Sequence, residues 1–215
     1  MDYRQLIVES GLRMADSGLT VETWGNISVR DKETGYVYMT PSAMRYDTIK
    51  CDDVVVMMTD GTIVDGARKP SIEKGLHLAV YKARPEVCAI IHTHPVNSMV
   101  YACQGREIPI FTDEAAQVLG DTVRTTPYQL PGTKEIADAA AAALGRRSNA
   151  CLLRSHGAVC VGRTMAEAFR TAAVLEMTAG ILYRIESTGG KPVPIAEEAI
   201  EAMQEFMRSG YGQDK

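Results

Sequence analysis

The segment from Cys88 to Pro95 constrains the fold of this chain more than any other. Residues 88–91 are apolar or small and predict a buried strand, which His92 and His94 follow directly. In an extended backbone, side chains at positions i and i+2 point to the same face, so both imidazoles reach one point. Two neutral imidazole nitrogens held in this way are typical ligands of a divalent metal, most often zinc. On this spacing alone, two polar residues that merely end a strand beside a proline remain the alternative.

Composition and charge exclude several classes of protein. The 215 residues are 46% hydrophobic and 23% charged, which suits one large globular domain with a substantial core. A formal charge of −4 argues against a general nucleic-acid binder. No run reaches the roughly 18 apolar residues of a membrane span, and the N-terminus is unlike a signal peptide. Five cysteines without CxxC spacing suit buried free thiols in a reducing compartment. We expect one cytoplasmic domain over residues 1–215, with neither a membrane nor a nucleic acid as partner.

Strand-like and helix-like segments divide the rest of the chain. Alternating or β-branched segments predict strands at 27–30, 36–39, 54–58, 88–91, 108–111, 150–154 and 158–161. Amphipathic segments predict helices at 3–17, 71–83, 95–103, 133–144, 164–182 and 196–207, with Ser71 and Thr133 as N-caps. Asp113 and Glu114 fall in an expected loop or short helix. For these two acids, a solvated turn is the default and an acid–base role is the alternative.

A third histidine extends the metal hypothesis. His156 follows a predicted strand and precedes a glycine, so three imidazoles can supply a zinc site with one open coordination position. An open zinc acts as a Lewis acid on a carbonyl or enediolate oxygen. Glu73 is the natural carboxylate for proton transfer beside it, although a helix start also favours a carboxylate for its dipole alone. For His77, four residues later, a packed or solvated side chain is the expected role.

A second group of residues suggests an anion-binding cradle. Gly25 lets the backbone approach a ligand closely, and Asn26 and Ser42 offer polar side chains nearby. The helix expected after Ser71 would add free N–H groups and a positive dipole end. A plain hairpin connection at Gly25 and Asn26, and a simple cap at Ser71, are the alternatives.

Five motifs in order give the chain a resemblance to the class II aldolase/adducin family, which includes L-fuculose-1-phosphate aldolases and L-ribulose-5-phosphate 4-epimerases. The motifs are Gly-Asn-Ile-Ser at 25–28, Thr-Pro-Ser at 40–42, Pro-Ser-Ile-Glu at 70–73, His-Thr-His-Pro at 92–95 and Ser-His-Gly at 155–157. The resemblance covers nearly the whole chain. It implies an α/β (α+β) fold of three αβα layers around a central, mainly antiparallel mixed sheet. It also implies a C4 homotetramer with active sites at the subunit interfaces.

The resemblance assigns a role to each motif. It implies one Zn²⁺ per subunit, with another divalent metal as the alternative, and Glu73 as catalytic acid/base. It implies that Tyr211 reaches into the neighbouring subunit's site. The implied metal ligands are His92, His94 and His156. The residues that match the family's phosphate-binding loops are Gly25, Asn26, Ser42, Ala43, Ser71 and Ile72.

The chain departs from the family pattern at some positions. Ala43 stands where glycine is common, and Ile72 stands where a second serine is common. The lost hydroxyl is worth roughly 1.5–3 kcal/mol in a hydrogen bond to a charged group, enough to weaken phosphate binding without abolishing it. The family's first active-site tyrosine aligns near Asp113, so that role is not carried over. Trp24 is similar to the epimerases, whereas Glu73 is similar to the aldolases.

The expected function is therefore that of a zinc-dependent aldolase, a metal-dependent aldehyde-lyase of carbohydrate metabolism. Its substrate would be a phosphorylated sugar, a ketose 1-phosphate of the L-fuculose or 5-deoxyketose type, cleaved reversibly into dihydroxyacetone phosphate and an aldehyde. A sugar-phosphate 4-epimerase or a sugar-acid decarboxylase on the same metal site is the alternative. A non-catalytic scaffold similar to the adducin head domain is the third hypothesis, which the intact histidine set disfavours.

Overall fold

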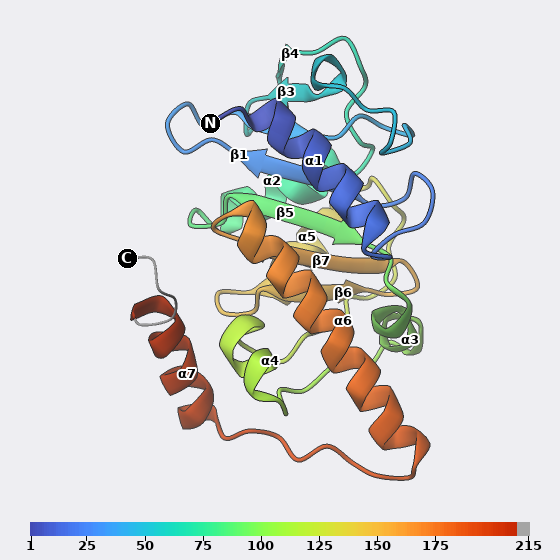
Figure 1. The fold of residues 1–215 in the computed structure, drawn as a ribbon, viewed down its shortest axis with the longest axis vertical. Helices are drawn as coiled ribbons and strands as arrows, with labels where there is room; N and C mark the ends of the chain where they lie inside the picture. The colour runs from blue at the N-terminus through green and yellow to red at the C-terminus, as the bar shows by residue number, and fades with distance from the viewer. Residues whose placement is uncertain (210–215) are drawn as a thin grey trace.

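A seven-stranded sheet forms the centre of the computed structural model, which describes residues 1–209 (Figure 1). The strands lie in the order β4-β3-β2-β1-β5-β7-β6, and every neighbouring pair is antiparallel. An isolated parallel bridge joins Thr125 to Leu152 at the β6 edge. The strands are β1 Asn26–Arg30, β2 Val37–Met39, β3 Val55–Met57, β4 Ile63–Asp65, β5 Ala89–Thr93, β6 Ala150–Leu153 and β7 Gly157–Gly162.

Helices cover both faces of this sheet. The α1 and α6 helices lie across the face turned to the viewer in Figure 1, and α2 and α5 lie behind it. The helices are α1 Tyr3–Asp16, α2 Lys74–Ala83, α3 Val96–Gln104, α4 Asp113–Val118, α5 Lys134–Leu144, α6 Met165–Ser187 and α7 Glu197–Ser209, with a short 3₁₀ helix, η1 Cys51–Asp53. The arrangement confirms the expected three-layer αβα fold.

Alternation along the central strand β5 divides the core in two. Ile91 packs into the cluster that contains Leu175 of α6, whereas Ile90 packs into the cluster that contains Leu76 of α2. All four side chains are fully or almost fully buried. Burial of each such side chain contributes roughly 1.5–3 kcal/mol, so the period-two pattern fixes which face each residue of β5 presents. The same alternation directs His92 and Ile90 to one face.

Two expectations about local structure are wrong. Residues 108–111 do not form a strand, because Ile108 makes one isolated bridge to Val123 and the carbonyl of Ile110 accepts from the N–H of Ile195. The helix expected to begin after Ser71 begins at Lys74, with Glu73 as its N-cap residue. The backbone N–H of Ser71 donates to the carbonyl of Thr40 (3.2 Å), which holds this segment extended against the end of β2.

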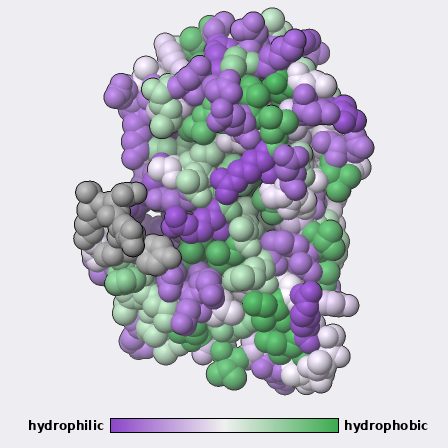
Figure 2. Space-filling view, in the orientation of Figure 1, coloured by the Kyte–Doolittle hydropathy of each residue, from purple (hydrophilic) through white to green (hydrophobic). Residues whose placement is uncertain are grey.

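The surface and the cysteines agree with a globular chain. Hydrophilic and hydrophobic residues are interspersed over the face shown in Figure 2. No helix within residues 1–209 combines the length and the apolar character that crossing a bilayer requires. The five cysteines are free thiols, as expected, but burial holds only for Cys88, Cys151 and Cys160, because Cys51 is half-buried and Cys103 is exposed.

Candidate metal centre

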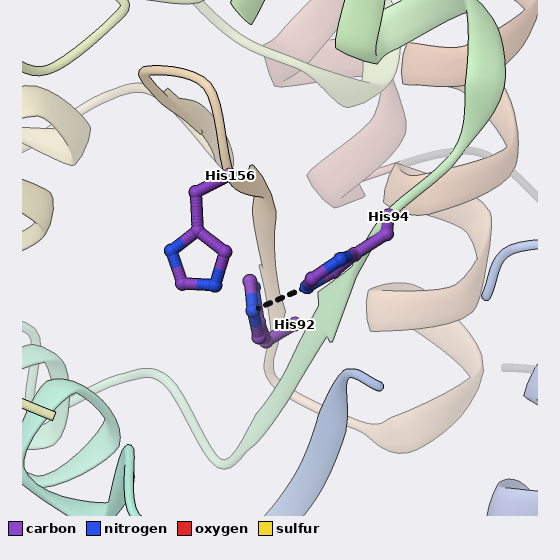
Figure 3. Close-up of side chains that lie close together, drawn as sticks. All are labelled: His92, His94 and His156. Atoms are coloured by element: carbon purple, nitrogen blue, oxygen red, sulfur yellow. Dashed lines mark hydrogen bonds between the residues drawn. The ribbon is translucent and has the colours of Figure 1, made fainter. Parts of the chain in front are cut away.

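Three histidines, two from the end of one strand and one from a turn, converge at one end of the sheet (Figure 3). His92 lies in β5, His94 follows β5, and His156 lies in the turn between β6 and β7. One nitrogen of each ring lies within 4.8 Å of one nitrogen of the other two. The Nε2 atoms of His92 and His94 are 3.0 Å apart. Strand β5 pairs with β7, so the sheet itself places the third histidine beside the first two.

Two glycines make this close approach feasible. A Cβ on Gly157 would overlap the carbonyl oxygen of Thr93 and lie 2.9 Å from Cε1 of His92. Gly25 has a φ of +76°, and a Cβ there would lie 2.6 Å from the carbonyl oxygen of His92. Gly157 is therefore required for steric space. Gly25 is required for steric space and also for its backbone conformation.

Helix α3 is held in place by a residue that sequence analysis missed. Its N-cap residue, Pro95, makes no side-chain capping bond. The carboxylate of Glu176 in α6 instead accepts from the backbone N–H groups of Asn97 (2.7 Å) and Ser98 (2.9 Å) and from both of their side chains. A carboxylate at a helix N-terminus satisfies free N–H groups and the helix dipole together. Glu176 thereby anchors the segment that carries His94.

The protonation chemistry of the histidines fits a divalent metal. Burial, and then the proximity of His92, lowers the pKa of His94 to about 3 and that of His156 to about 4, so both are neutral near pH 7. Burial opposes a charge on His92, but Glu73 outweighs it and raises the pKa of His92. The Nδ1–H of His92 donates to the carbonyl of Ala158 (3.0 Å), a type of bond that fixes the tautomer of metal-ligating histidines. A bound cation would replace the proton that the Glu73 ion pair favours on Nε2.

Glu73 directs its carboxylate at the three histidines. Its Oε2 lies 3.1 Å from Nε2 of His92, and its Oε1 lies 3.5 Å from Nε2 of His156. Burial raises the pKa of Glu73, but His92, His156 and a bond from the Asn26 side chain together hold that pKa well below its usual range. Oε1 of Glu73 and Nδ1 of His156 are buried without a hydrogen-bond partner in the described part of the chain. Buried atoms of this kind are typical of a site that binds a further group.

The residues of the predicted anion cradle come together only in part. An isolated bridge between Pro41 and Pro70 places their two loops side by side. The N–H groups of Ser42 and Ser71 are already bonded, to the carbonyls of Lys69 and Thr40. Ser71 Oγ, in turn, accepts from the N–H of Glu73 (3.2 Å).

The donors left for an anion come from three residues, Ser42, Ala43 and Ile72. The backbone N–H groups of Ala43 and Ile72 donate no hydrogen bond within residues 1–209, and neither does the hydroxyl of Ser42. Ala43 has a φ of +56°, which explains why glycine suits this position. The side chain of Ile72 is 67% exposed, so it points away from the buried Glu73 beside it.

Other predicted residues lie apart from the histidines or outside the described chain. Asp113 and Glu114 are exposed in the first turn of α4, which agrees with the default of solvated acids. His77 is fully buried, as expected for a packed histidine. Tyr211 lies outside the described residues.

The fold and the site together define an αβα protein with three histidines at one end of its sheet that could hold a metal ion. The chain belongs to the class II aldolase and adducin N-terminal domain family, whose sequence model matches residues 5–183. It is 38% identical to 5-deoxy-D-ribulose 1-phosphate aldolase of Bacillus thuringiensis serovar kurstaki over 98% of this chain and 97% of that protein. It is 30% identical to L-ribulose-5-phosphate 4-epimerase of Salmonella paratyphi C over 84% of this chain and 83% of that one. A solved L-fuculose 1-phosphate aldolase superimposes with a TM-score of 0.91 and 36% identity over 96% of both chains.

Proposed function

We propose that this protein is a zinc-dependent class II aldolase. It cleaves a ketose 1-phosphate, of the 5-deoxyketose or L-fuculose type, reversibly into dihydroxyacetone phosphate and an aldehyde. The observation that carries the proposal is the Glu73 carboxylate, whose oxygens lie 3.1 Å and 3.5 Å from the Nε2 atoms of His92 and His156. A carboxylate at this distance can move a proton on a substrate held by the same centre. Aldolases among the similar proteins support the reaction type, although a shared fold alone would not.

Each residue of the site has a part in this chemistry. His92, His94 and His156 hold the ion, and another divalent metal is the alternative to zinc. When bound, the ion supplies Lewis-acid polarisation of the substrate's carbonyl group. In the synthetic direction, Glu73 takes a proton from the hydroxymethylene carbon of dihydroxyacetone phosphate. In cleavage it returns a proton to that carbon.

The substrate phosphate would lie against the loops that begin at Gly25, Ser42 and Ser71. The unbonded N–H groups of Ala43 and Ile72 supply the main donors there, with the Ser42 hydroxyl and the backbone at Gly25 and Asn26. Backbone N–H groups bind phosphate oxygens whatever the side chain, so the loss of a serine hydroxyl at position 72 is tolerated. The residues 1–215 act as one cytoplasmic domain. They assemble as a homotetramer in which Tyr211 of one subunit completes the site of the next.

The test is the release of dihydroxyacetone phosphate by wild-type protein and by Glu73→Gln. The amide keeps the shape of the side chain but cannot carry the proton, so we expect about 10²–10⁴-fold slower cleavage with zinc still bound. Glu114→Gln, at an exposed position in α4, is the matched control and should cleave at the wild-type rate. If Glu73→Gln binds zinc and keeps full activity, the role of Glu73 is wrong.

A 4-epimerase is the second candidate. Trp24, which lies directly before Gly25 and is 59% exposed, supports this candidate because the chain is similar to the epimerases at this position. An epimerase is also among the similar proteins. Inversion at C4 of L-ribulose 5-phosphate, without release of dihydroxyacetone phosphate from any ketose 1-phosphate, would select this function.

A further inference from the structure

A chain of four buried hydrogen bonds leads from the interior of the protein to Glu73. Tyr81 OH lies 2.7 Å from Ser28 Oγ, which lies 2.7 Å from Nδ1 of His77. Nε2 of His77 lies 2.6 Å from Oδ1 of Asn26, and Nδ2 of Asn26 lies 2.9 Å from Oε2 of Glu73. All five side chains are buried. None of the resemblances assigns a role to Ser28, His77 or Tyr81.

The chemistry of the groups allows one direction for this chain. An ionised Glu73 only accepts hydrogen bonds, so Asn26 presents its NH₂ group to the carboxylate and its oxygen to His77. The amide oxygen also only accepts, so Nε2 of His77 carries a proton and Nδ1 accepts from the hydroxyl of Ser28. Ser28 has spent its proton on that bond, and Tyr81 must therefore donate to it. Burial lowers the pKa of His77 to about 3, which agrees with a neutral ring that donates at one nitrogen and accepts at the other.

The chain makes the two oxygens of Glu73 unequal. Oε2 accepts from Asn26, whereas Oε1 is buried without a hydrogen-bond partner in the described chain and lies 3.5 Å from Nε2 of His156. If the Asn26 amide were reversed, its oxygen would face the carboxylate and its NH₂ would face the N–H of His77, so both contacts would be repulsive. Asn26 is also the register partner of His92 in the β1–β5 pair, which ties the chain to the histidine cluster.

We propose that His77 and Ser28 are positioning residues that hold the Asn26 amide in one orientation, so that Oε2 of Glu73 is fixed and Oε1 carries the proton. This inference rests on the function proposed above. A side chain that only filled space at position 77 could be replaced by any residue of similar shape. A side chain that orients the amide needs an N–H donor at the place of Nε2.

Substitutions at position 77 separate these roles. In His77→Gln, the side-chain amide can donate from nearly the same place, whereas His77→Met has similar length and no donor. We expect His77→Met to slow deuterium exchange at the hydroxymethylene carbon of dihydroxyacetone phosphate by about 10–100-fold, with KM and zinc content close to wild type. His77→Gln should recover most of the exchange rate. Ser28→Ala, which removes the donor to Nδ1 with less steric change, should lie between wild type and His77→Met.

Thr126→Val is the control, because the Thr126 hydroxyl is also buried but has no partner in the described residues. It should exchange deuterium at the wild-type rate. Exchange by His77→Met at the wild-type rate, or by His77→Gln as slowly as by His77→Met, would overturn the proposal.

Nitrogen-15 NMR of histidine-labelled holoenzyme tests the hydrogen-bond chain without any substrate. The chain has four histidines, so the signal lost in His77→Gln identifies His77. We expect a protonated Nε2 and an unprotonated Nδ1, and the opposite tautomer would overturn the proposal whatever the enzyme does. A wild-type protein that cleaves no ketose 1-phosphate but shows this tautomer would sink the proposed function while retaining the orientation of Asn26. In uniformly nitrogen-15-labelled holoenzyme, loss of the low-field Asn26 NH₂ signal in His77→Met is the expected companion result, and an unchanged signal would contradict it.

Discussion

Replacing Gly157 by alanine tests how far the histidine cluster depends on the close approach of β5 and β7. The new Cβ would lie 2.9 Å from His92 Cε1 and 3.0 Å from His94 Cδ2, and it would overlap the backbone oxygen of Thr93. Carbon atoms pack best at about 3.5–4.0 Å, so each ring must move by about 0.5 Å or more. Sites of this kind tolerate displacements of about 0.5 Å. The carbonyl oxygen of Thr93 belongs to the backbone and cannot rotate away from the new Cβ.

We expect two measurable losses in Gly157→Ala. The free energy of unfolding of the metal-free protein should fall by about 1–3 kcal/mol, as for other overpacked sites. Zinc affinity, measured by competition with a chromophoric chelator, should fall by about 10–100-fold. Gly75→Ala is the matched control, because a Cβ there meets nothing within 4 Å and Gly75 lies in the first turn of α2. If both variants bind zinc equally tightly and are equally stable, the close approach does not hold the cluster in place.

Three further predictions concern stability. Ala43→Gly should raise the free energy of unfolding by up to about 1 kcal/mol in urea denaturation, because the left-handed backbone strains alanine more than the added chain entropy costs; a less stable variant would contradict this. The metal-free protein should melt at progressively lower temperature as the pH falls from about 6.5 to 4. The unfolded chain takes up protons there on His77, His94 and His156, whose folded pKa values are lowered to between about 3 and 4. His92 has a raised pKa and opposes this trend. A melting temperature that stays constant over this pH range would mean that the lowered pKa values of the other three histidines are wrong. Glu176→Gln should lower the free energy of unfolding by about 1–2 kcal/mol in thermal denaturation, because an amide cannot accept from all four donors at the start of α3. A variant as stable as the wild type would contradict this role of the carboxylate.

Local patterns predicted the elements that carry the site. The apolar run before His92 identified β5, and the i, i+2 spacing brought His94 toward the same point as His92. The apolar alternation at 108–111 misled because it buries Ile108 and Ile110 in the core beside α6 without a strand to pair with.

Contacts between distant segments could not be predicted from such patterns. Glu176 accepts from Asn97, 79 residues away, and nothing in either segment indicates this pairing. The hydrogen bond between Ser28 of β1 and His77 of α2 joins residues 49 positions apart, so it depends on how this helix packs on the sheet. The resemblance to a family supplied the role of Glu73, and the structure added the inequality of its two oxygens.

The most direct test of the account is the release of dihydroxyacetone phosphate from a panel of ketose 1-phosphates, before chelation, after chelation and after the return of zinc. The panel should include 5-deoxyribulose 1-phosphate and L-fuculose 1-phosphate. A metal-dependent aldolase should release dihydroxyacetone phosphate from at least one of them, lose that activity with the chelator and regain it with zinc. Release that the chelator leaves unchanged, or no release from a protein shown to bind zinc through His92, His94 and His156, would contradict the account.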